Sequence, residues 1–423
     1  MDKKTDHSDP SEADWLGWRG KMMIDQSSIN LNTGSYGHTP KSVFSHAEAI
    51  RKQIAIQPMD FLIRHLPQKL FQARFDLANF LNGSFASTVF FPNVTLALNV
   101  VIHSIPKIIG PSTDLATVEI LLSDLEYGSL VWAWEKIAKQ TGLKLIWVRM
   151  PRRPKSPDEI LDAFQHHRTA ATRAIFFSHI TSPTGMILPA REICAWAKTH
   201  SIVSIVDGAH APGFAPLDLQ TVGADFYGAN CHKWLLAPIS SGFLCASPDW
   251  LERLDPLWVS WGYEMDPNLG IHQTDDLGST PAIRRLECAG TVDPSPYLAV
   301  GSAIEFHQEI GSAAIWARQA KLNKRVREIV SEVVDWDIQT PPLGEMSGGM
   351  VAYRLPYRGP IPPLRKFLWD RFRLEVNFID REGDPLMIRF STHFYNTMEE
   401  VEILRDAVPA LQNYLSTLGG LCP

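Results

Sequence analysis

Cysteine is scarce in this chain, and long hydrophobic runs are missing. The five cysteines among 423 residues are widely spaced and include no CxxC pair, a pattern that predicts neither a disulfide framework nor a zinc site. The longest apolar region, residues 89–109, is interrupted by Pro92, Asn93 and Lys107, so it indicates a strand, a turn and a core helix rather than a membrane span. Residues 1–14 lack the apolar stretch of a secretory signal. We therefore expect a soluble, cytoplasmic protein with reduced thiols and no membrane partner.

An excess of positive charge is also absent. The chain has 40 lysines and arginines against 46 aspartates and glutamates, a formal net charge of −6, which argues against a nucleic-acid partner. Its length favours two domains. We expect an N-terminal arm over residues 1–29, a large domain over residues 30–300 and a smaller C-terminal α+β domain over residues 301–423. A long helical stretch after Pro296 is expected to connect the two domains.

Short apolar runs alternate with segments of helical period through most of the chain. Residues 118–122, 143–148, 174–178 and 202–206 have the character of buried strands. After the first of these strands, apolar side chains recur every three or four residues, as on one face of an amphipathic helix, at Leu130, Trp134, Ile137 and Thr141. The repeated order of strand, helix and strand predicts an α/β fold with a mainly parallel sheet covered by helices.

Two polar residues stand at informative places in this pattern. The strand in SIVSIVDGAHAPG ends at Asp207, which predicts a carboxylate at the carboxyl edge of the sheet, where ligands of open α/β sheets bind. In GANCHKW, Lys233 lies in apolar company before a small-residue strand. Burial disfavours its ammonium form and leaves a candidate nucleophile toward an aldehyde. Taken alone, Asp207 is equally compatible with a turn or helix cap, and Lys233 with a solvated surface.

An aspartate and a buried lysine together suit pyridoxal 5'-phosphate. The carboxylate keeps the pyridine nitrogen protonated, and the amine holds the cofactor as a Schiff base and later moves protons. The phosphate requires a helix N-terminus, and FFPNVTLALN offers a strand, then a capping turn of Asn93, Val94 and Thr95, then a helix. We expect Thr95 to contact the phosphate, a role compatible with ordinary helix capping.

Eight sequence blocks occur along the chain in a distinctive order. They are LNTGSYGHTP (31–40), PNVTLALN (92–99), DLEYGS (124–129), SHITSPTG (178–185), VDGAHAPG (206–213), GANCHKW (228–234), CAGTVDPSPYLA (288–299) and RFSTHFYNT (389–397). In this order they resemble the class V aminotransferase family of fold-type I pyridoxal-phosphate enzymes, and within it most resemble the isopenicillin N epimerases. The resemblance implies that family's fold, with a mainly parallel sheet of the seven-stranded type in the large domain.

The resemblance also implies roles for individual residues. Lys233 would hold the cofactor, Asp207 would pair with the ring nitrogen, and Tyr127 would stack on the pyridine face, where related desulfurases usually use a histidine. Arg389 resembles the family's clamp for the substrate carboxylate. The other implied contacts are Ser182 and His210 near the 3'-oxygen, Asn93, Val94, Thr95, Asn230 and His232 at the phosphate, Thr291 reached from the neighbouring subunit of a homodimer, and Ser35, Tyr36 and His38 at the substrate mouth. Without this context Tyr127 could be a core aromatic residue and Arg389 a structural ion-pair partner.

The choice of reaction stays open at this point. Our leading hypothesis is that Lys233 abstracts the Cα proton of an amino acid or peptidyl amino acid, leading to epimerisation. Elimination at a C–S or other β bond, and transamination, are the alternatives within the family. Desulfurases of the family carry a nucleophilic cysteine shortly before the carboxylate-binding arginine, and residues 375–387 contain none, which argues against sulfur abstraction.

Two hypotheses from other classes are weaker. A non-catalytic binding protein could keep this fold without turnover, although every expected cofactor residue type is present. A metal site built on His210 and His232 would need partner ligands at suitable spacing, and the sequence offers none beside them. We therefore expect pyridoxal 5'-phosphate and an amino-acid-like substrate, and no metal.

Overall fold

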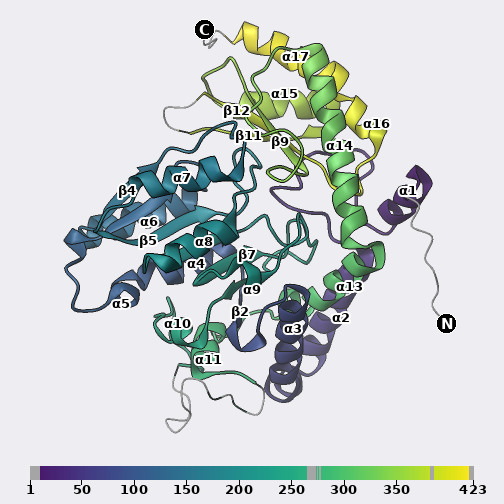
Figure 1. The fold of residues 1–423 in the computed structure, drawn as a ribbon. Coiled ribbons are helices and arrows are strands. Elements are labelled where there is room, and N and C mark those ends of the chain that lie inside the picture. Colours follow the sequence, from purple (N-terminus) through teal and green to yellow (C-terminus); the bar gives the residue numbers. More distant parts are fainter. Residues whose placement is uncertain (1–9, 264–272, 274, 276–277, 382–384, 419–423) are drawn as a thin grey trace, which may run out of the picture.

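A seven-stranded sheet forms the centre of the larger domain, in the order β2-β8-β7-β6-β5-β3-β4 (Figure 1). The computed structural model describes residues 10–263, 273, 275, 278–381 and 385–418. Within these residues, β8 is the strand that runs antiparallel to its neighbours, and the others share one direction. The strands are β2 (Thr88–Phe91), β3 (Glu119–Ser123), β4 (Lys144–Val148), β5 (Thr172–Ser178), β6 (Val203–Gly208), β7 (Phe226–Asn230) and β8 (Gly242–Cys245). The predicted α/β class with a mainly parallel sheet is confirmed.

Alternating side chains of the strands pack on opposite faces of this sheet. On β5, Ile175 and Phe177 belong to one buried cluster, while Ala174 and Phe176 belong to the other. The first face is covered by α2 (Lys41–Ile56), α3 (Leu66–Phe80), α7 (Pro157–His167), α8 (Ala190–Thr199) and α13 (Val300–Ile310). The second is covered by α4 (Val94–His103), α6 (Gly128–Thr141) and α11 (Pro281–Glu287). A central sheet buried on both faces explains its nearly continuous apolar strands.

The long helical stretch expected after Pro296 is divided in the structure. It comprises α12 (Ser295–Leu298), α13, and α14 (Ser312–Val333), and the break between the last two falls at Gly311, whose φ is +90°. Only glycine adopts that backbone conformation readily. Figure 1 shows α14 continuing from α13 toward the C-terminal elements. The connection between the domains is therefore helical, as expected, but bent at one residue.

The C-terminal part of the chain forms a smaller α+β domain with its own core. Its antiparallel sheet, ordered β11-β12-β9, consists of β9 (Met350–Arg354), β11 (Asn377–Ile379) and β12 (Met387–Ser391). α14, α15 (Pro362–Phe372), α16 (Met398–Glu402) and α17 (Leu404–Thr417) pack around it. A segment from the N-terminal region joins this domain, because β1 (Ile29–Asn30) pairs in parallel with β10 (Leu374–Glu375). The boundaries proposed at residues 29/30 and 300/301 stay a prediction.

The remaining elements are short and lie around the two domains. They are α1 (Glu12–Gly20), α5 (Ile105–Ile109), α9 (Leu219–Val222), α10 (Pro248–Glu252), a π-helical segment (Asp60–His65) and single 3-10 turns at Phe85–Ser87 and Leu115–Thr117. Across the parts of the chain that the structure describes, no helix combines the length and the apolar content required to cross a bilayer.

Candidate active site

The carboxyl ends of β5, β6 and β7 bring polar residues together. Ser178 lies opposite Asp207 in the register of β5 and β6, and Asp207 lies opposite Gly228 on β7. The Asp207 side chain is buried, and its Oδ1 accepts a hydrogen bond of 2.9 Å from the N–H of Ala209. Burial raises the pKa of Asp207 to about 6, opposed by that hydrogen bond and by Lys233. The strand end therefore delivers a carboxyl group that still ionises near neutral pH.

Lys233 follows β7 and faces the same site. Burial, together with the charge of Arg389, lowers the pKa of Lys233 to about 8, and Asp207 opposes this shift. Its Nζ lies 3.3 Å from His210 Nε2. An ordinary lysine is protonated up to much higher pH. A larger fraction of the Lys233 amine than of an ordinary lysine is therefore neutral and nucleophilic near neutral pH.

A chain of aromatic side chains fixes His210 against this lysine. Trp234 Nε1–H donates to His210 Nδ1 at 3.2 Å. Burial and the nearby Lys233 hold the pKa of His210 well below its ordinary value, so the ring is neutral. Because Nδ1 accepts a hydrogen bond, the single ring proton sits on Nε2, toward Lys233. On its other side Trp234 stacks on His393, with ring centroids 5.7 Å apart.

The N-terminus of α4 closes one end of the site. Asn93 is the N-cap and accepts from the N–H of Leu96 at 3.0 Å, and Asn230 Oδ1 accepts from the N–H of Val94 at 2.9 Å. The helix therefore begins two residues earlier than a cap at Thr95 would place it, and Thr95 lies inside the first turn. Among the described residues, no hydrogen bond engages the Thr95 N–H. The first turn thus keeps a free donor at a positive helix end.

Arg389 lies on β12 of the small domain and reaches across to the large domain. Its guanidinium is buried, its Nη1 donates to the backbone oxygen of Ser182 and lies 3.3 Å from Ser182 Oγ, and burial lowers its pKa to about 10. Its Nε has no partner among the described residues. The group remains a cation at any physiological pH, and no buried carboxylate of the described chain is paired with it. It is therefore available to an anionic ligand.

The N-terminal loop around residues 33–38 joins the two domains at this place. Gly37 N–H donates to the His232 carbonyl at 3.1 Å, and a Cβ on Gly37 would stand 2.0 Å from the Lys233 carbonyl oxygen. A Cβ on Gly34 would stand 2.8 Å from Nη2 of Arg389. Glycine is required at both positions, because other atoms lie too close to leave room for a Cβ. The sequence offered LNTGSYGHTP as a block without indicating that its glycines touch the two cationic residues.

The three polar side chains of this loop face different ways. Tyr36 stacks on His232, with centroids 6.2 Å apart, and is 61% exposed. Ser35 Oγ donates to Asn32 Oδ1 at 2.8 Å. His38 Nε2 lies 3.2 Å from Asn30 Nδ2 and its ring contacts Tyr395, while burial lowers its pKa. Tyr36 is thus the member of the three that is free to meet a ligand, and the other two brace the loop.

A family model and curated relatives place this architecture among known proteins. The Aminotransferase class-V model matches residues 55–355. The chain belongs to the class V aminotransferase family. It is 44% identical over 400 residues to the isopenicillin N epimerase of Streptomyces clavuligerus, covering 94% of this chain and 98% of the relative. The isopenicillin N epimerase of Amycolatopsis lactamdurans is 42% identical over 398 residues, with 94% and 98% covered.

A solved structure shares the fold. The cystine C–S lyase C-DES, in complex with its reaction product cysteine persulfide, superposes with a TM-score of 0.76 at 21% identity, covering 94% of this chain and 99% of that one. The predicted class V family and its fold type are thereby confirmed. As a member of this family the chain is a pyridoxal-phosphate enzyme.

The residues present fit that cofactor. Three buried or helix-end polar groups lack partners among the described residues: the Thr95 N–H, His232 Nδ1 and Arg389 Nε. His232 is neutral, since burial lowers its pKa to about 4. The site offers a free helix end for the phosphate and a partly neutral amine for the aldehyde. It also offers a carboxylate for the protonated pyridine nitrogen. The donor set and the charges thus match the cofactor's three polar parts.

Two predicted family contacts lie at the margin of the site. Tyr127 is the N-cap of α6 and is 48% exposed, so one face of its ring is open. Thr291 is exposed between α11 and α12, and no hydrogen bond joins it to the predicted site residues among those described. Both positions suit residues whose partner comes from outside the chain. Their roles stay predictions.

One buried ionisable residue of the site escaped sequence analysis. Glu126, next to Tyr127, is 3% exposed and accepts hydrogen bonds from Ser123 and Ser178. A glutamate three residues after the end of a buried strand is a signal that could have identified it, because an unpaired charged residue is seldom so buried. Trp234, Gly34 and Gly37 were also missed, since their contacts join distant segments.

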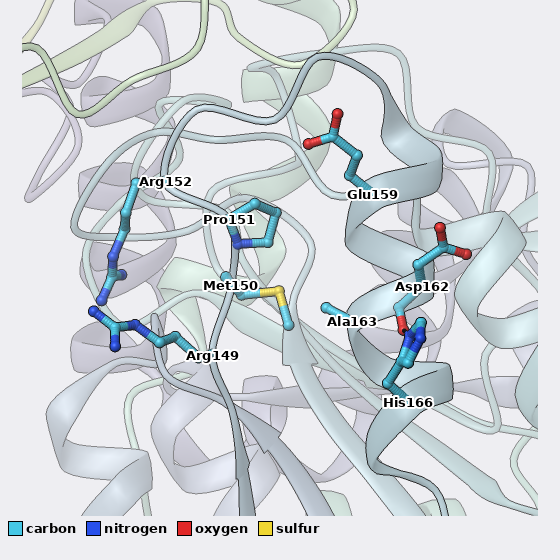
Figure 2. A pocket seen from close by; sticks show the side chains of 8 residues that line it. All are labelled: Arg149, Met150, Pro151, Arg152, Glu159, Asp162, Ala163 and His166. Atoms are coloured by element: carbon cyan, nitrogen blue, oxygen red, sulfur yellow. Dashed lines mark hydrogen bonds between the residues drawn. The ribbon is translucent and has the colours of Figure 1, made fainter.

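A pocket away from this site contains none of the predicted residues. It has a volume of about 580 Å³ and lies where β4 ends and α7 passes. Figure 2 shows Arg149 and Arg152 on one side and Glu159, Asp162 and His166 projecting from α7 on the other. Opposite charges face the same hollow, so it does not favour one class of charged ligand.

Proposed function

We propose that this enzyme inverts the α-carbon of an amino-acid or peptidyl amino-acid substrate, with isopenicillin N as the first compound to test. One observation carries the proposal. The partly neutral amine of Lys233 shares a site with the buried Arg389 guanidinium, whose charge adds to the effect of burial in lowering the pKa of Lys233. A base beside a carboxylate-binding cation is the arrangement that Cα proton removal requires. Similarity over nearly the full length of two isopenicillin N epimerases supports inversion over the alternatives.

In this reaction the protein itself holds the cofactor and moves the proton. When bound, pyridoxal phosphate supplies an aldehyde that condenses with an amine, releasing water, and a ring that takes up the electron pair left at Cα. Lys233 holds the cofactor before the substrate arrives and then carries the Cα proton on Nζ. Neutral His210, with its proton on Nε2, lies 3.3 Å from that amine and orients it. Inversion then requires that a second group, on the opposite face of the substrate, return a proton to Cα, with no net oxidation or reduction.

Two charged residues orient the reactants. Asp207, ionised above about pH 6, keeps a proton on the pyridine nitrogen, since a buried anion beside that nitrogen favours its charged form. Arg389 receives the substrate carboxylate in a fork of two N–H donors, and its bond to Ser182 keeps the guanidinium in place. Tyr127 covers one face of the ring and Tyr36 borders the substrate mouth.

The phosphate is held at the first turn of α4. Thr95 supplies a free N–H and a hydroxyl, and His232 supplies an unpartnered ring nitrogen. Asn93 and Asn230 act on the same turn, because they accept from the N–H groups of Leu96 and Val94 and so fix its geometry. The first turn of α4, with Asn93, Val94 and Thr95, thereby forms with Asn230 and His232 an anion site at a helix N-terminus.

A second copy of the chain completes the site. Thr291 is exposed beside an apolar surface formed by residues 257–263, in which Val259 is 72% and Trp261 96% exposed. Ser260 of this surface lies close to the chain that leads to Thr291, since its Oγ is 4.0 Å from Cys288 Sγ. A contiguous exposed apolar surface of this kind favours a protein interface. We propose that this surface packs on a partner, so that each Thr291 reaches the phosphate of the other subunit.

Sedimentation at equilibrium tests the dimer. The native protein is expected to sediment as a dimer, and Trp261→Asp as a monomer with weakened cofactor binding. Thr291→Ala is expected to remain dimeric while binding the cofactor more weakly. A native monomer that binds the cofactor tightly would contradict the shared site.

Incubation in deuterium oxide tests the reaction. The purified protein should be yellow, and borohydride followed by peptide mapping should label Lys233. With isopenicillin N we expect deuterium at Cα together with optical inversion, and no release of keto acid, thiol or pyruvate. Keto acid would indicate an aminotransferase, and thiol or pyruvate a lyase. A protein that binds the cofactor but exchanges no Cα proton with any substrate would support a binding protein and contradict the proposal.

A further inference from the structure

Glu126 is a buried carboxyl group that the roles assigned above leave unused. It lies between the end of β3 and the start of α6, directly before Tyr127, and is 3% exposed. Its carboxyl accepts from Ser123 Oγ, from the Ser178 N–H at 3.1 Å and from Ser178 Oγ at 2.6 Å. Among the described residues, no lysine, arginine or histidine forms an ion pair with it. Hydroxyl and amide groups alone satisfy this carboxyl.

These hydrogen bonds join two parts of the cofactor site. Ser178 is the last residue of β5 and lies opposite Asp207 on β6, and the next residue, His179, donates its N–H to the Asp207 carbonyl at 2.9 Å. Ser123 ends β3, and Tyr127 caps α6 immediately afterwards. Glu126 therefore connects the turn that presents Tyr127 to the strand end that abuts Asp207. Displacing its carboxyl would release both.

We propose that Glu126 is a positioning residue, which fixes Tyr127 and Asp207 relative to one another through its hydrogen bonds to Ser123 and Ser178. The inference rests on the proposed pairing of Asp207 with the pyridine nitrogen. Of the elements packed against Glu126, β3 presents the Ser123 hydroxyl, β5 presents Ser178, and β6 presents Asp207, the ionisable group that acts on it. A neutral carboxyl donates to one serine oxygen and accepts from the other hydroxyl and from the amide.

The electrostatics of the two carboxyl groups favour a neutral Glu126 beside an ionised Asp207. Burial, with a further contribution from Asp207, raises the pKa of Glu126 to about 7, whereas that of Asp207 is raised to about 6. Two buried carboxylates so close disfavour simultaneous ionisation. Asp207 has Lys233 nearby and a positive ring nitrogen to face, so the negative charge resides on Asp207. Glu126 then contributes shape and hydrogen bonds without competing for the pyridinium.

Substitutions at Glu126 separate position from charge. We expect Glu126→Ala to weaken binding of pyridoxal phosphate to the apoprotein about tenfold, because buried donors lose their acceptor, and to shift the visible absorbance of the bound cofactor. Glu126→Gln keeps the neutral shape and is expected to restore both the dissociation constant and the spectrum. The readouts are a fluorescence titration of the apoprotein and an absorbance titration with pH. Wild-type affinity and spectrum in Glu126→Ala, or a Gln variant as impaired as Ala, would overturn the proposal.

A matched pair of serines controls for loss of stability. Ser178→Ala removes the 2.6 Å bond to Glu126, and Ser204→Ala removes a 2.9 Å bond to Asp225 at the other end of β6. Both variants should lower the Tm, but only Ser178→Ala should weaken cofactor binding. Equal weakening in both would indicate a general structural effect and overturn the proposal. Asp207→Ala provides the separate test: if it leaves affinity and spectrum unchanged, the proposed pairing fails, whatever Glu126 does.

Discussion

The two sides of the active site are built in different ways. The proposed cofactor side, formed by Asp207, His210, Asn230 and Lys233, lies on adjacent strand ends of one sheet, and the contact between Lys233 and His210 spans 23 residues. The substrate side, formed by Gly34, Tyr36 and Arg389, joins segments from opposite ends of the chain: the bond from Gly34 N–H to Ser391 Oγ spans 357 residues.

This difference distinguishes a rigid cofactor side from a substrate side that determines specificity. A parallel sheet places its carboxyl ends in register, so the cofactor side follows from local topology and is the same whatever the substrate. The substrate side exists only when the small domain and the N-terminal loop meet the large domain. Variants of the first side should therefore affect the cofactor spectrum, and variants of the second should affect KM and kcat with the spectrum preserved.

Lys233→Ala gives the largest expected loss, on the cofactor side. Without its amine there is neither an attachment point nor a proton carrier, and we expect kcat/KM for Cα exchange to fall by about 10⁴-fold. The measurement is deuterium incorporation at Cα, with the visible spectrum of the protein recorded alongside. Lys198→Ala, at the end of α8, is the control and should retain full activity. Retained exchange in Lys233→Ala would contradict the role of this amine.

Arg389→Lys tests the substrate side. A lysine keeps the charge but loses the fork of parallel donors, so we expect kcat/KM to fall about a hundredfold through misplacement of the carboxylate. The visible spectrum and the cofactor dissociation constant should stay those of the native protein. If the spectrum changes as much as in Lys233 variants, the two sides are not separable and the comparison above is wrong. Ser182→Ala, which loses only the weaker contact at 3.3 Å, should be milder.

Gly37→Ala tests the junction of the two sides. A Cβ there would stand 2.0 Å from the Lys233 carbonyl oxygen, so the backbone of the loop must shift. We expect kcat/KM to fall about tenfold with a small change in the spectrum, since a backbone displacement of this size alters both KM and proton transfer. Gly17→Ala is the control, because nothing lies within 4 Å of a Cβ at that position in α1. Equal behaviour of the two variants would refute a close junction.

The sequence indicated which segments form the proposed cofactor side, but little of how the proposed substrate side is assembled. Asp207 and Lys233 could be singled out because a polar residue at the end of a buried strand breaks an apolar pattern. The α4 turn was located correctly, but its cap is Asn93 rather than Thr95, a distinction that depends on backbone angles. The contacts of Gly34 and Gly37 with Arg389 and Lys233 depend on the meeting of distant segments, which no local period encodes. Glu126 was overlooked because its partner Ser178 belongs to another strand.

The smallest expected effect concerns stability of the apoprotein and Asp207. Burial raises the pKa of Asp207 to about 6 in the folded state, above its value in an unfolded chain of about 3.9. Between these values the folded protein binds more protons than the unfolded protein, so this group's contribution lowers the free energy of unfolding as pH rises through that interval. The destabilisation is complete above about pH 6 and amounts to about 3 kcal/mol at most.

Asp207→Asn removes this contribution, because the amide does not ionise. Urea unfolding of the apoproteins near about pH 4 and about pH 7 should show the variant gaining stability relative to the native protein as pH rises. Parallel curves for the two proteins would contradict the buried, ionising carboxyl. With cofactor bound the order should reverse, since the native carboxylate then faces a protonated nitrogen and stabilises the complex. An unfavourable charge kept in the apoprotein is thus what one expects of a residue retained for its ligand rather than for the fold.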